Sequence, residues 1–161
     1  MNDVWIIYIT SQNPNWISLE FQNNVIPSLR LYHTSIVCNK GKASRMIIIF
    51  GGRDSNLKAL NDLWGLRQHR NGTWSWTKPE INDNLLKVRY NHSVAIYDNL
   101  MFIIGGRQNN SNFVSLPIQV FNLNTSQIFD FPHLEMIRHS SFIFEKNIYL
   151  YCGLDNIQNS P

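Results

Sequence analysis

Short apolar segments recur along the chain, and none of them shows a sustained helical period. The segments 46–50 (MIIIF) and 100–105 (LMFIIG) are apolar throughout, which is typical of strands buried on both faces. The segment 73–78 (TWSWTK) alternates apolar and polar residues, as a strand with one buried face does. Between it and the segment 60–66 (LNDLWGL), which we expect to be another strand, stands an Asn-Gly pair, the signature of a hairpin turn. The pattern predicts an all-β fold of short antiparallel strands.

Alignment on glycine pairs reveals an internal repeat. Each copy begins with a histidine followed by Ser or Thr, runs as a first strand (33–38 and 92–97 in two copies), and reaches a second strand that ends in the pair. The copies recur every 47–59 residues, a period that fits four short strands per unit. Repeated four-stranded antiparallel units predict the blades of a β-propeller. The repeated positions are His33-Thr34, His92-Ser93 and His139-Ser140, with Gly51-Gly52, Gly105-Gly106 and Cys152-Gly153.

The second half of each unit also recurs, and it predicts how the chain divides. The motif NDVW (2–5) matches NDLW (61–64), and a further tryptophan follows each, whereas 118–129 has Phe and Ile in place of Trp. We expect the repeated tryptophans, Trp64 and Trp74 among them, to fill the space between blades. The predicted units are a half blade with strands 3 and 4 at 1–24, blades at 25–79 and 80–131, and an incomplete last blade at 132–161.

About three units are fewer than the four to eight blades of a propeller ring. An open arc leaves a sheet edge and an apolar flank exposed. We therefore expect the 161 residues to be a fragment of a larger ring, completed by blades from the rest of the protein or by self-association. Alone, the arc should be only marginally stable.

Composition and charge narrow the function classes. The net charge is only +3 and no dense basic cluster exists, which argues against nucleic-acid binding. No apolar stretch reaches 18 residues, and the N-terminus lacks the basic region of a signal peptide, so we expect no membrane association. The two cysteines form no CxxC motif, which favours a reducing compartment, cytoplasmic or nuclear.

The repeated residues suggest ligand sites that their context does not support. Neither glycine pair is followed by the Lys of a P-loop or by the third glycine of a dinucleotide-binding motif, so we assign Gly51, Gly52, Gly105 and Gly106 a structural role. The histidines at 33, 92 and 139 sit on different blades, which we place near the outer parts of the ring, too far apart to share a metal ion. No nucleophile elbow is present, and paired carboxylates are scarce among the 11 scattered acids. We predict no catalytic residue, metal ion or cofactor within the chain.

Four arginines are the candidates for partner contact. Arg53 and Arg107 each follow a glycine pair, so they belong to the loop between strands 2 and 3 and should share one face of the arc. Arg30 and Arg89 each stand three residues before a repeated histidine, near the same end. An arginine cluster there could anchor an anion or a peptide. The alternative for Arg30 and Arg89 is that they bond backbone groups or acids such as Asp62 within the fold.

The repeated set resembles the kelch repeat: R-x-x-H-[ST], an apolar strand, Gly-Gly, NDLW and a later Trp. A closer resemblance links RLYHTS, IFGGRDSN, LNDLWGLRQHRNGTWSW, RYNHSVAIYDN and IIGGR to the kelch portion of plant and protist serine/threonine phosphatases. The segment 64–76 (WGLRQHRNGTWSW) is the most specific part, and RHSSFIFEKNIYLYCGLDNIQNSP resembles that family's last repeat. Cys152 in place of the first glycine and Met136 in place of the arginine depart from the pattern.

The resemblance implies a non-catalytic module that binds a protein or peptide segment and serves as the regulatory or substrate-docking part of a phosphatase. The metallophosphatase motifs (GDxHG, GDxxDRG and GNHE types) are missing from these residues, so a dimetal centre would require a further domain. Kelch repeats also occur in BTB-type ubiquitin-ligase adaptors and in actin-binding proteins, which stay open as alternatives. A sugar-oxidase propeller is more distant, since no copper-binding Tyr and His can be placed.

Overall fold

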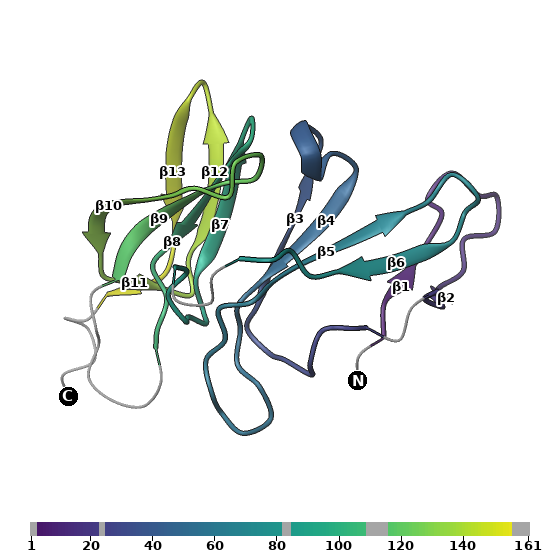
Figure 1. Ribbon diagram of the computed structural model, residues 1–161, viewed down its shortest axis with the longest axis horizontal. Coiled ribbons are helices and arrows are strands. Elements are labelled where there is room, and N and C mark those ends of the chain that lie inside the picture. Colours follow the sequence, from purple (N-terminus) through teal and green to yellow (C-terminus); the bar gives the residue numbers. More distant parts are fainter. Residues whose placement is uncertain (1–2, 23–24, 82–84, 109–115, 156–161) are drawn as a thin grey trace.

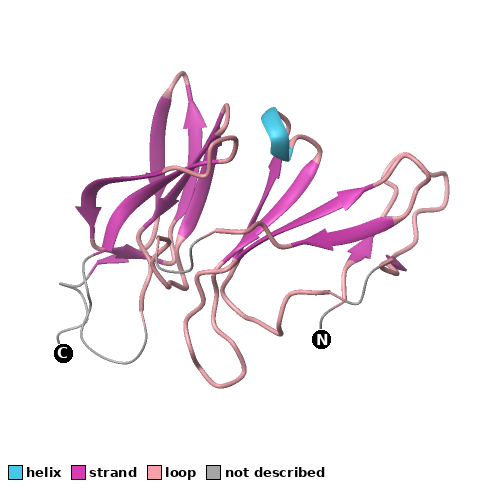
Figure 2. Ribbon diagram, viewed as in Figure 1, coloured by secondary structure: helices cyan, strands magenta, loops and turns pink. Residues whose placement is uncertain are grey.

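The computed structural model describes residues 3–22, 25–81, 85–108 and 116–155. Strands and loops make up almost all of this part of the chain, together with one short 3-10 turn, η1 (Gly41–Ala43) (Figure 2). In chain order the strands are β1 (Trp5–Ile6), β2 (Ile17–Ser18), β3 (Thr34–Cys38), β4 (Met46–Phe50), β5 (Leu63–Gln68), β6 (Trp74–Thr77), β7 (Ser93–Tyr97), β8 (Leu100–Ile104), β9 (Leu116–Asn122), β10 (Ile128–Leu134), β11 (Met136–Ile137), β12 (Ser140–Phe144), β13 (Asn147–Tyr151) and β14 (Leu154–Asp155).

These strands form antiparallel sheets that follow one another along the chain. Two are four-stranded meanders, in the orders β3-β4-β5-β6 and β7-β8-β9-β10, and β1-β2, β12-β13 and β11-β14 are two-stranded. Figure 1 shows them fanned out in an open arc, with β1 and β2 at one side and β12 and β13 at the other. The prediction of an all-β, partial β-propeller is confirmed.

The three units share one register. Thr34 lies opposite Phe50, Ser93 opposite Ile104 and Ser140 opposite Tyr151, so the Ser or Thr of each repeat faces the last residue before the glycine position. The hairpin turn predicted at 69–72 is confirmed by the backbone bond from His69 N–H to the Thr73 carbonyl, 2.8 Å.

The third strand of the first complete unit starts later than the sequence predicts. The segment 60–66 was expected to be extended throughout, but β5 begins at Leu63. Ala59 forms a bridge with Arg53, and Leu60 N–H donates to the Gly52 carbonyl at 2.9 Å. These residues therefore close the loop after the glycine pair before the strand begins.

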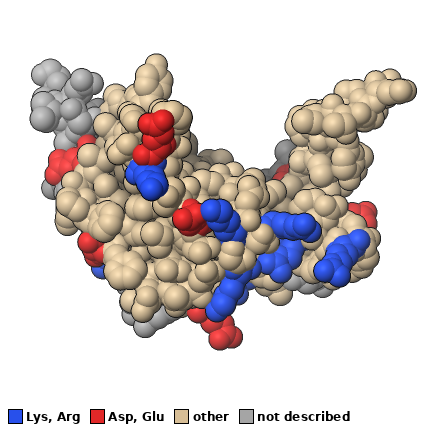
Figure 3. All heavy atoms as spheres, turned by 90° about the horizontal axis from the view of Figure 1, so that it is seen from above, with Lys and Arg blue, Asp and Glu red and all other residues tan. Residues whose placement is uncertain are grey.

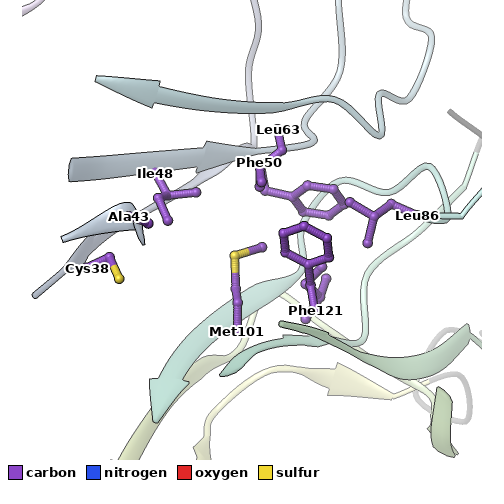
Figure 4. Close-up of a cluster of buried hydrophobic side chains, with 9 residues drawn as sticks. Cys38, Ala43, Ile48, Phe50, Leu63, Leu86, Met101 and Phe121 are labelled. Atoms are coloured by element: carbon purple, nitrogen blue, oxygen red, sulfur yellow. The ribbon is translucent and has the colours of Figure 1, made fainter. Parts of the chain in front are cut away.

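The main hydrophobic cluster lies between the two four-stranded sheets (Figure 4). Phe50 and Ile48 of β4 meet Met101 and Ile103 of β8, all almost fully buried. Each such side chain contributes about 1.5–3 kcal/mol relative to an exposed one. A second cluster of Trp64, Leu66 and Trp76, with Val4, Phe21, Ile47, Ile49 and Trp74 packed against it, joins β1–β2 to the first four-stranded sheet.

The first glycine of each pair allows the next unit to approach. Gly51 has φ +60, and a Cβ on it would lie 2.7 Å from the Arg89 carbonyl oxygen. Gly105 has φ +61, and a Cβ there would lie 2.1 Å from the Met136 carbonyl oxygen. Both distances are shorter than atoms tolerate, so only glycine fits this close backbone contact. In the third unit the equivalent residue is Cys152, which is exposed and has φ +57.

Candidate functional site

The repeated histidines link neighbouring sheets. Nε2 of His92 lies 2.9 Å from the Thr34 hydroxyl of the preceding sheet, and Nε2 of His139 lies 2.7 Å from the Ser93 hydroxyl. The His92 ring also packs edge-on against Phe50, with ring centroids 5.2 Å apart. His92 and His139 therefore each bond the Ser or Thr that follows the histidine of the previous unit, so the repeated His-[ST] pair connects one unit to the next.

The predicted position of these histidines near the outer parts of the ring is wrong. They directly precede β3, β7 and β12, and β7 contacts both β3 and β12 across the sheet boundaries. The first strands of successive units are thus their points of closest approach. Among the residues that the structure describes, no group of three His, Cys, Asp or Glu side chains is arranged to hold a metal ion.

Burial keeps these imidazoles neutral. It lowers the pKa of His92 to about 3, and the nearby Arg89 charge adds to the effect. Burial also lowers the pKa of His139, and burial together with Arg30 lowers that of His33. A neutral ring carries one N–H and one acceptor nitrogen, which suits a single hydrogen bond to a hydroxyl.

Arg30 uses its guanidinium inside the fold. Two of its nitrogens donate to the Asp62 carboxylate at 2.6 and 2.8 Å, and one donates to the Gly51 carbonyl at 3.1 Å. Trp64 Nε1 donates to the same carboxylate at 2.6 Å. Burial alone would raise the pKa of Asp62, but these hydrogen bonds outweigh it and hold that pKa below its usual value.

Arg89 is fully buried and bonds only neutral oxygens. It donates to the Gly105 carbonyl at 3.0 Å, to the Pro117 carbonyl at 3.3 Å and to the Gln119 side chain at 3.1 Å. Burial lowers its pKa to about 10. The donors of Arg89, like those of Arg30, are directed into the fold. Both arginines therefore bond groups within the fold, and neither belongs to the candidate surface.

Arg53 presents a different geometry. Its guanidinium lies over the Tyr90 ring, 5.2 Å from the centroid, and its Nε donates to the Leu57 carbonyl at 2.7 Å. No hydrogen bond joins its two terminal nitrogens to the described residues, and the side chain is half-buried. An arginine held by an aromatic face, with its terminal nitrogens available, suits a planar anion such as a carboxylate.

Arg107 occupies the equivalent place in the next unit. Its N–H and carbonyl pair with Tyr90 at 2.8 and 2.9 Å, as those of Arg53 pair with Leu31. Tyr32, which is exposed, lies beside Tyr90 with ring centroids 6.3 Å apart. Tyr32, Arg53, Tyr90 and Arg107 form the arginine–tyrosine surface.

Sequence reasoning found the two arginines of this surface but missed the tyrosines. It also missed a neighbouring row, formed by the residue before each repeated histidine. Tyr32, Asn91 and Arg138 all have φ between +56 and +59. Asn91 N–H donates to the Tyr32 carbonyl at 3.2 Å, and Arg138 N–H donates to the Asn91 carbonyl at 3.0 Å. The available signal was that this position changes identity from repeat to repeat while the histidine after it does not.

A second group of basic residues lies at the turn between β3 and β4. Lys40 pairs with Asp98 of the next unit, and an Arg67 nitrogen donates to the Lys42 carbonyl at 3.1 Å. Figure 3 views the molecule from the end where this turn lies in Figure 1, and shows basic side chains interspersed with acids. Because acids lie among these basic residues and one of them pairs with Lys40, the net positive charge of this group is smaller than its number of Lys and Arg residues suggests.

Comparisons with known proteins agree with this architecture. A family model described as the KLHDC2/KLHL20/DRC7 Kelch-repeats domain matches residues 1–159. Host cell factor 2 of Homo sapiens is 34% identical over 90 residues, which cover 55% of this chain and 11% of that protein. The serine/threonine-protein phosphatase BSL2 of Arabidopsis thaliana is 26% identical over 125 residues, 77% of this chain and 12% of that protein.

Kelch domain-containing protein 3 of Rattus norvegicus is 25% identical over 162 aligned residues, which cover 92% of this chain and 40% of that protein. The chain thus spans two fifths or less of the length of these three relatives. No helix in the described part of the chain is long and apolar enough to cross a membrane. The family match covers nearly every residue and the sheets repeat as blades, so this chain belongs to the kelch-repeat family.

Proposed function

We propose that the chain is the docking part of a serine/threonine protein phosphatase and binds an acidic protein segment through the arginine–tyrosine surface. A kelch domain is a module for protein–protein interaction. The similarity to the BSL2 phosphatase and the resemblance of segment 64–76 support the phosphatase assignment. The geometry of Arg53 supports the choice of surface and carries the proposal.

The chemistry of this surface favours a carboxylate ligand. The terminal nitrogens of Arg53 can donate two parallel hydrogen bonds to one carboxylate, while the Tyr90 ring behind them restricts the guanidinium. Exposed Tyr32 adds aromatic contact area, which is enriched in protein interfaces. In this proposal the kelch chain supplies recognition, and a dimetal centre in a separate domain removes phosphate from the bound protein.

Binding can be tested on the full-length protein with a fluorescein-labelled oligoglutamate peptide and fluorescence anisotropy. Arg53→Glu should weaken binding about tenfold or more, since it places a negative charge where the peptide carboxylates bind. The matched control is Arg70→Glu, an equal charge change in the exposed 69–72 turn, which should show a much smaller effect. Wild-type binding should also weaken with added salt. Equal effects of the two variants would contradict the choice of surface.

The phosphatase assignment has its own test. Sequencing the transcript beyond the codon for Pro161 should show the carboxylate–histidine motifs of a dimetal phosphatase. A reading frame without them would remove the phosphatase role and favour a kelch adaptor, without affecting the peptide-binding result.

A further inference from the structure

A cavity of about 260 Å³ lies between the two four-stranded sheets. Part of its wall belongs to the main hydrophobic cluster, which contributes Ala43, Ile48, Leu63 and Phe121 from the two units (Figure 4). The rest of the wall comes from β5, from β6 and from the turn between β9 and β10. None of the four residues of the arginine–tyrosine surface lines the cavity, so it is a separate feature of the fold.

Small residues on the first sheet leave this space open. Gly65 of β5 lies between Ile48 of β4 and Thr77 of β6, and it has no side chain to project from the sheet. The Met46 side chain ends close by, 3.0 Å from where a Cβ on Gly65 would be. Because methionine is flexible, this part of the wall can adjust to a bound molecule.

The second sheet carries large side chains at the equivalent positions. The registers of the two sheets align on the Ser or Thr of each repeat, which makes Val120 the equivalent of Gly65 and Phe129 the equivalent of Thr77. The fold therefore accepts bulky residues at both positions, and the first sheet has small ones. The difference provides a preformed cavity between two blades, and ligand sites are usually largely preformed.

The polar side of the cavity carries positive charge. Lys42 lines it and is exposed, and its ammonium forms no hydrogen bond or ion pair with the described residues. The Lys42 backbone is held on both sides, since its N–H donates to the Asn124 side-chain oxygen at 2.9 Å and its carbonyl accepts from Arg67 at 3.1 Å. No acidic side chain of the described residues lines the cavity. A cation at the mouth of an apolar cavity favours a ligand with one negative charge.

The size and the walls of the cavity indicate the rest of the ligand. An apolar cavity of roughly 150 Å³ holds one benzene molecule, so the larger volume here has room for a ring with a short chain. Phe121, Trp64 and Met46 all line the cavity. Aromatic rings and the methionine sulfur interact favourably with an aromatic ring placed beside them.

We propose that this cavity is a binding site for a small aromatic carboxylate. The ring of the ligand lies between the two sheets beside Gly65 and Thr77, and its carboxylate binds the Lys42 ammonium at the mouth. The site goes beyond the proposed docking of a protein segment. Its test uses neither the oligoglutamate peptide nor Arg53, so each proposal can fail without the other.

Binding can be measured on the full-length protein by isothermal titration calorimetry with 3-phenylpropionate. We expect saturable binding with a dissociation constant of about 1 mM or lower, as for a small ligand that buries most of its atoms. The neutral analogue 3-phenylpropanol should bind about fivefold more weakly, because it lacks the charge that Lys42 recognises. Absence of saturable 3-phenylpropionate binding would overturn the proposal, and equal affinities would remove the role of Lys42.

A variant that fills the cavity tests where the ligand binds. Thr77→Phe introduces the residue that the second sheet has at this position, and Thr77 is exposed, so the variant should fold. It should weaken 3-phenylpropionate binding about tenfold or more, because the new ring occupies the space of the ligand. The matched control is Gln68→Phe, at an exposed position of β5 whose side chain faces away from the cavity, and it should bind as the wild type does. Wild-type affinity in Thr77→Phe would place the ligand elsewhere and refute the site.

A charge variant tests the contact with the carboxylate. Lys42→Met keeps an apolar stem and removes the ammonium, so it should weaken 3-phenylpropionate binding about fivefold and leave 3-phenylpropanol binding unchanged. Arg70→Met removes an exposed cation that does not line the cavity, and it should change the affinity for neither compound. Equal losses for the two compounds in Lys42→Met, or equal losses of 3-phenylpropionate affinity in Lys42→Met and Arg70→Met, would contradict a direct bond from Lys42.

Discussion

Lowering the pH from 7.5 to 4.5 should destabilise the fold through His92. Burial lowers the pKa of this residue from 6.5 to about 3. The unfolded chain binds a proton at His92 as the pH falls below 6.5, whereas the folded chain resists it until about 3. Because the unfolded state holds more protons in this window, the free energy of unfolding falls as the pH falls through it. Two pH units below 6.5 correspond to about 3 kcal/mol from this residue.

The other shifted groups determine the choice of pH. The pKa values of His33 and His139 are also lowered, so they act in the same direction as His92. Asp62 has a pKa below 3.8, so its stabilisation is complete above that pH and is lost only in stronger acid. A measurement at pH 4.5 therefore reports mainly on the histidines. A loss of this size is a large fraction of the 5–15 kcal/mol that a domain typically has.

Urea unfolding followed by tryptophan fluorescence, at one protein concentration, measures the effect. His92→Gln keeps a side-chain amide that can bond the Thr34 hydroxyl but removes the titration. The free energy of unfolding of the wild type should fall by about 3 kcal/mol more than that of His92→Gln between the two pH values. His69→Gln, in the exposed hairpin turn, should behave as the wild type does. An equal pH-dependent loss in the wild type and His92→Gln would refute the assignment.

Three further predictions concern stability and use the same unfolding assay. Gly105→Ala should lower the free energy of unfolding by more than about 3 kcal/mol, because a Cβ there would lie 2.1 Å from a backbone carbonyl oxygen of the next unit. Gly72→Ala has open space around its Cβ and should lower it only by the left-handed backbone strain of about 1–2 kcal/mol. Similar losses in the two variants would contradict the packing role of Gly105. Asp62→Asn should lower the free energy of unfolding by about 3 kcal/mol, because it leaves the nearly buried Arg30 guanidinium without its counter-charge. Lys40→Ala, in the exposed ion pair with Asp98, should change it little. A larger loss for Lys40→Ala than for Asp62→Asn would be inconsistent with the observed burial. Arg89→Met should lower the free energy of unfolding by about 3 kcal/mol or more, because three oxygen acceptors lose their donor. An unchanged free energy of unfolding would show that water takes the place of the Arg89 donors.

The architecture was predictable because its determinants are local and repeated. The apolar segments 46–50 and 100–105 have few alternatives to buried strands, and the Asn-Gly turn specifies its hairpin. The glycine pairs mark where each second strand ends. Because these signals repeat, the blades are predictable even where the end of one strand is not. At Leu63, contacts of the preceding residues within the loop delay the start of β5.

The sequence left the roles of the arginines open, although it named a bond to an acid such as Asp62 as the alternative for Arg30 and Arg89. Arg30 and Arg53 are both single arginines beside a repeat motif, but Arg30 meets a carboxylate 32 residues further along the chain. Arg53 meets the ring of Tyr90, which belongs to the next unit. Arg30 and Asp62 belong to the same unit, whereas no local pattern encodes the Arg53 contact, which depends on how two sheets lie side by side. The tyrosines of the arginine–tyrosine surface were missed for the same reason.

The packing between units also limits where this chain can bind a partner. At the repeated positions, the His92 side chain holds one sheet against the next, the Arg89 side chain bonds acceptors within its own unit, and the first glycines leave no room for a ligand. The row before the histidines is different, since its backbone is bonded across units while its side chains change from Tyr32 to Asn91 to Arg138. A position with a fixed backbone and a variable side chain can change its specificity without loss of the fold. Recognition by this chain should therefore depend on that row and on the adjoining arginines, and changes there should alter binding with little effect on unfolding.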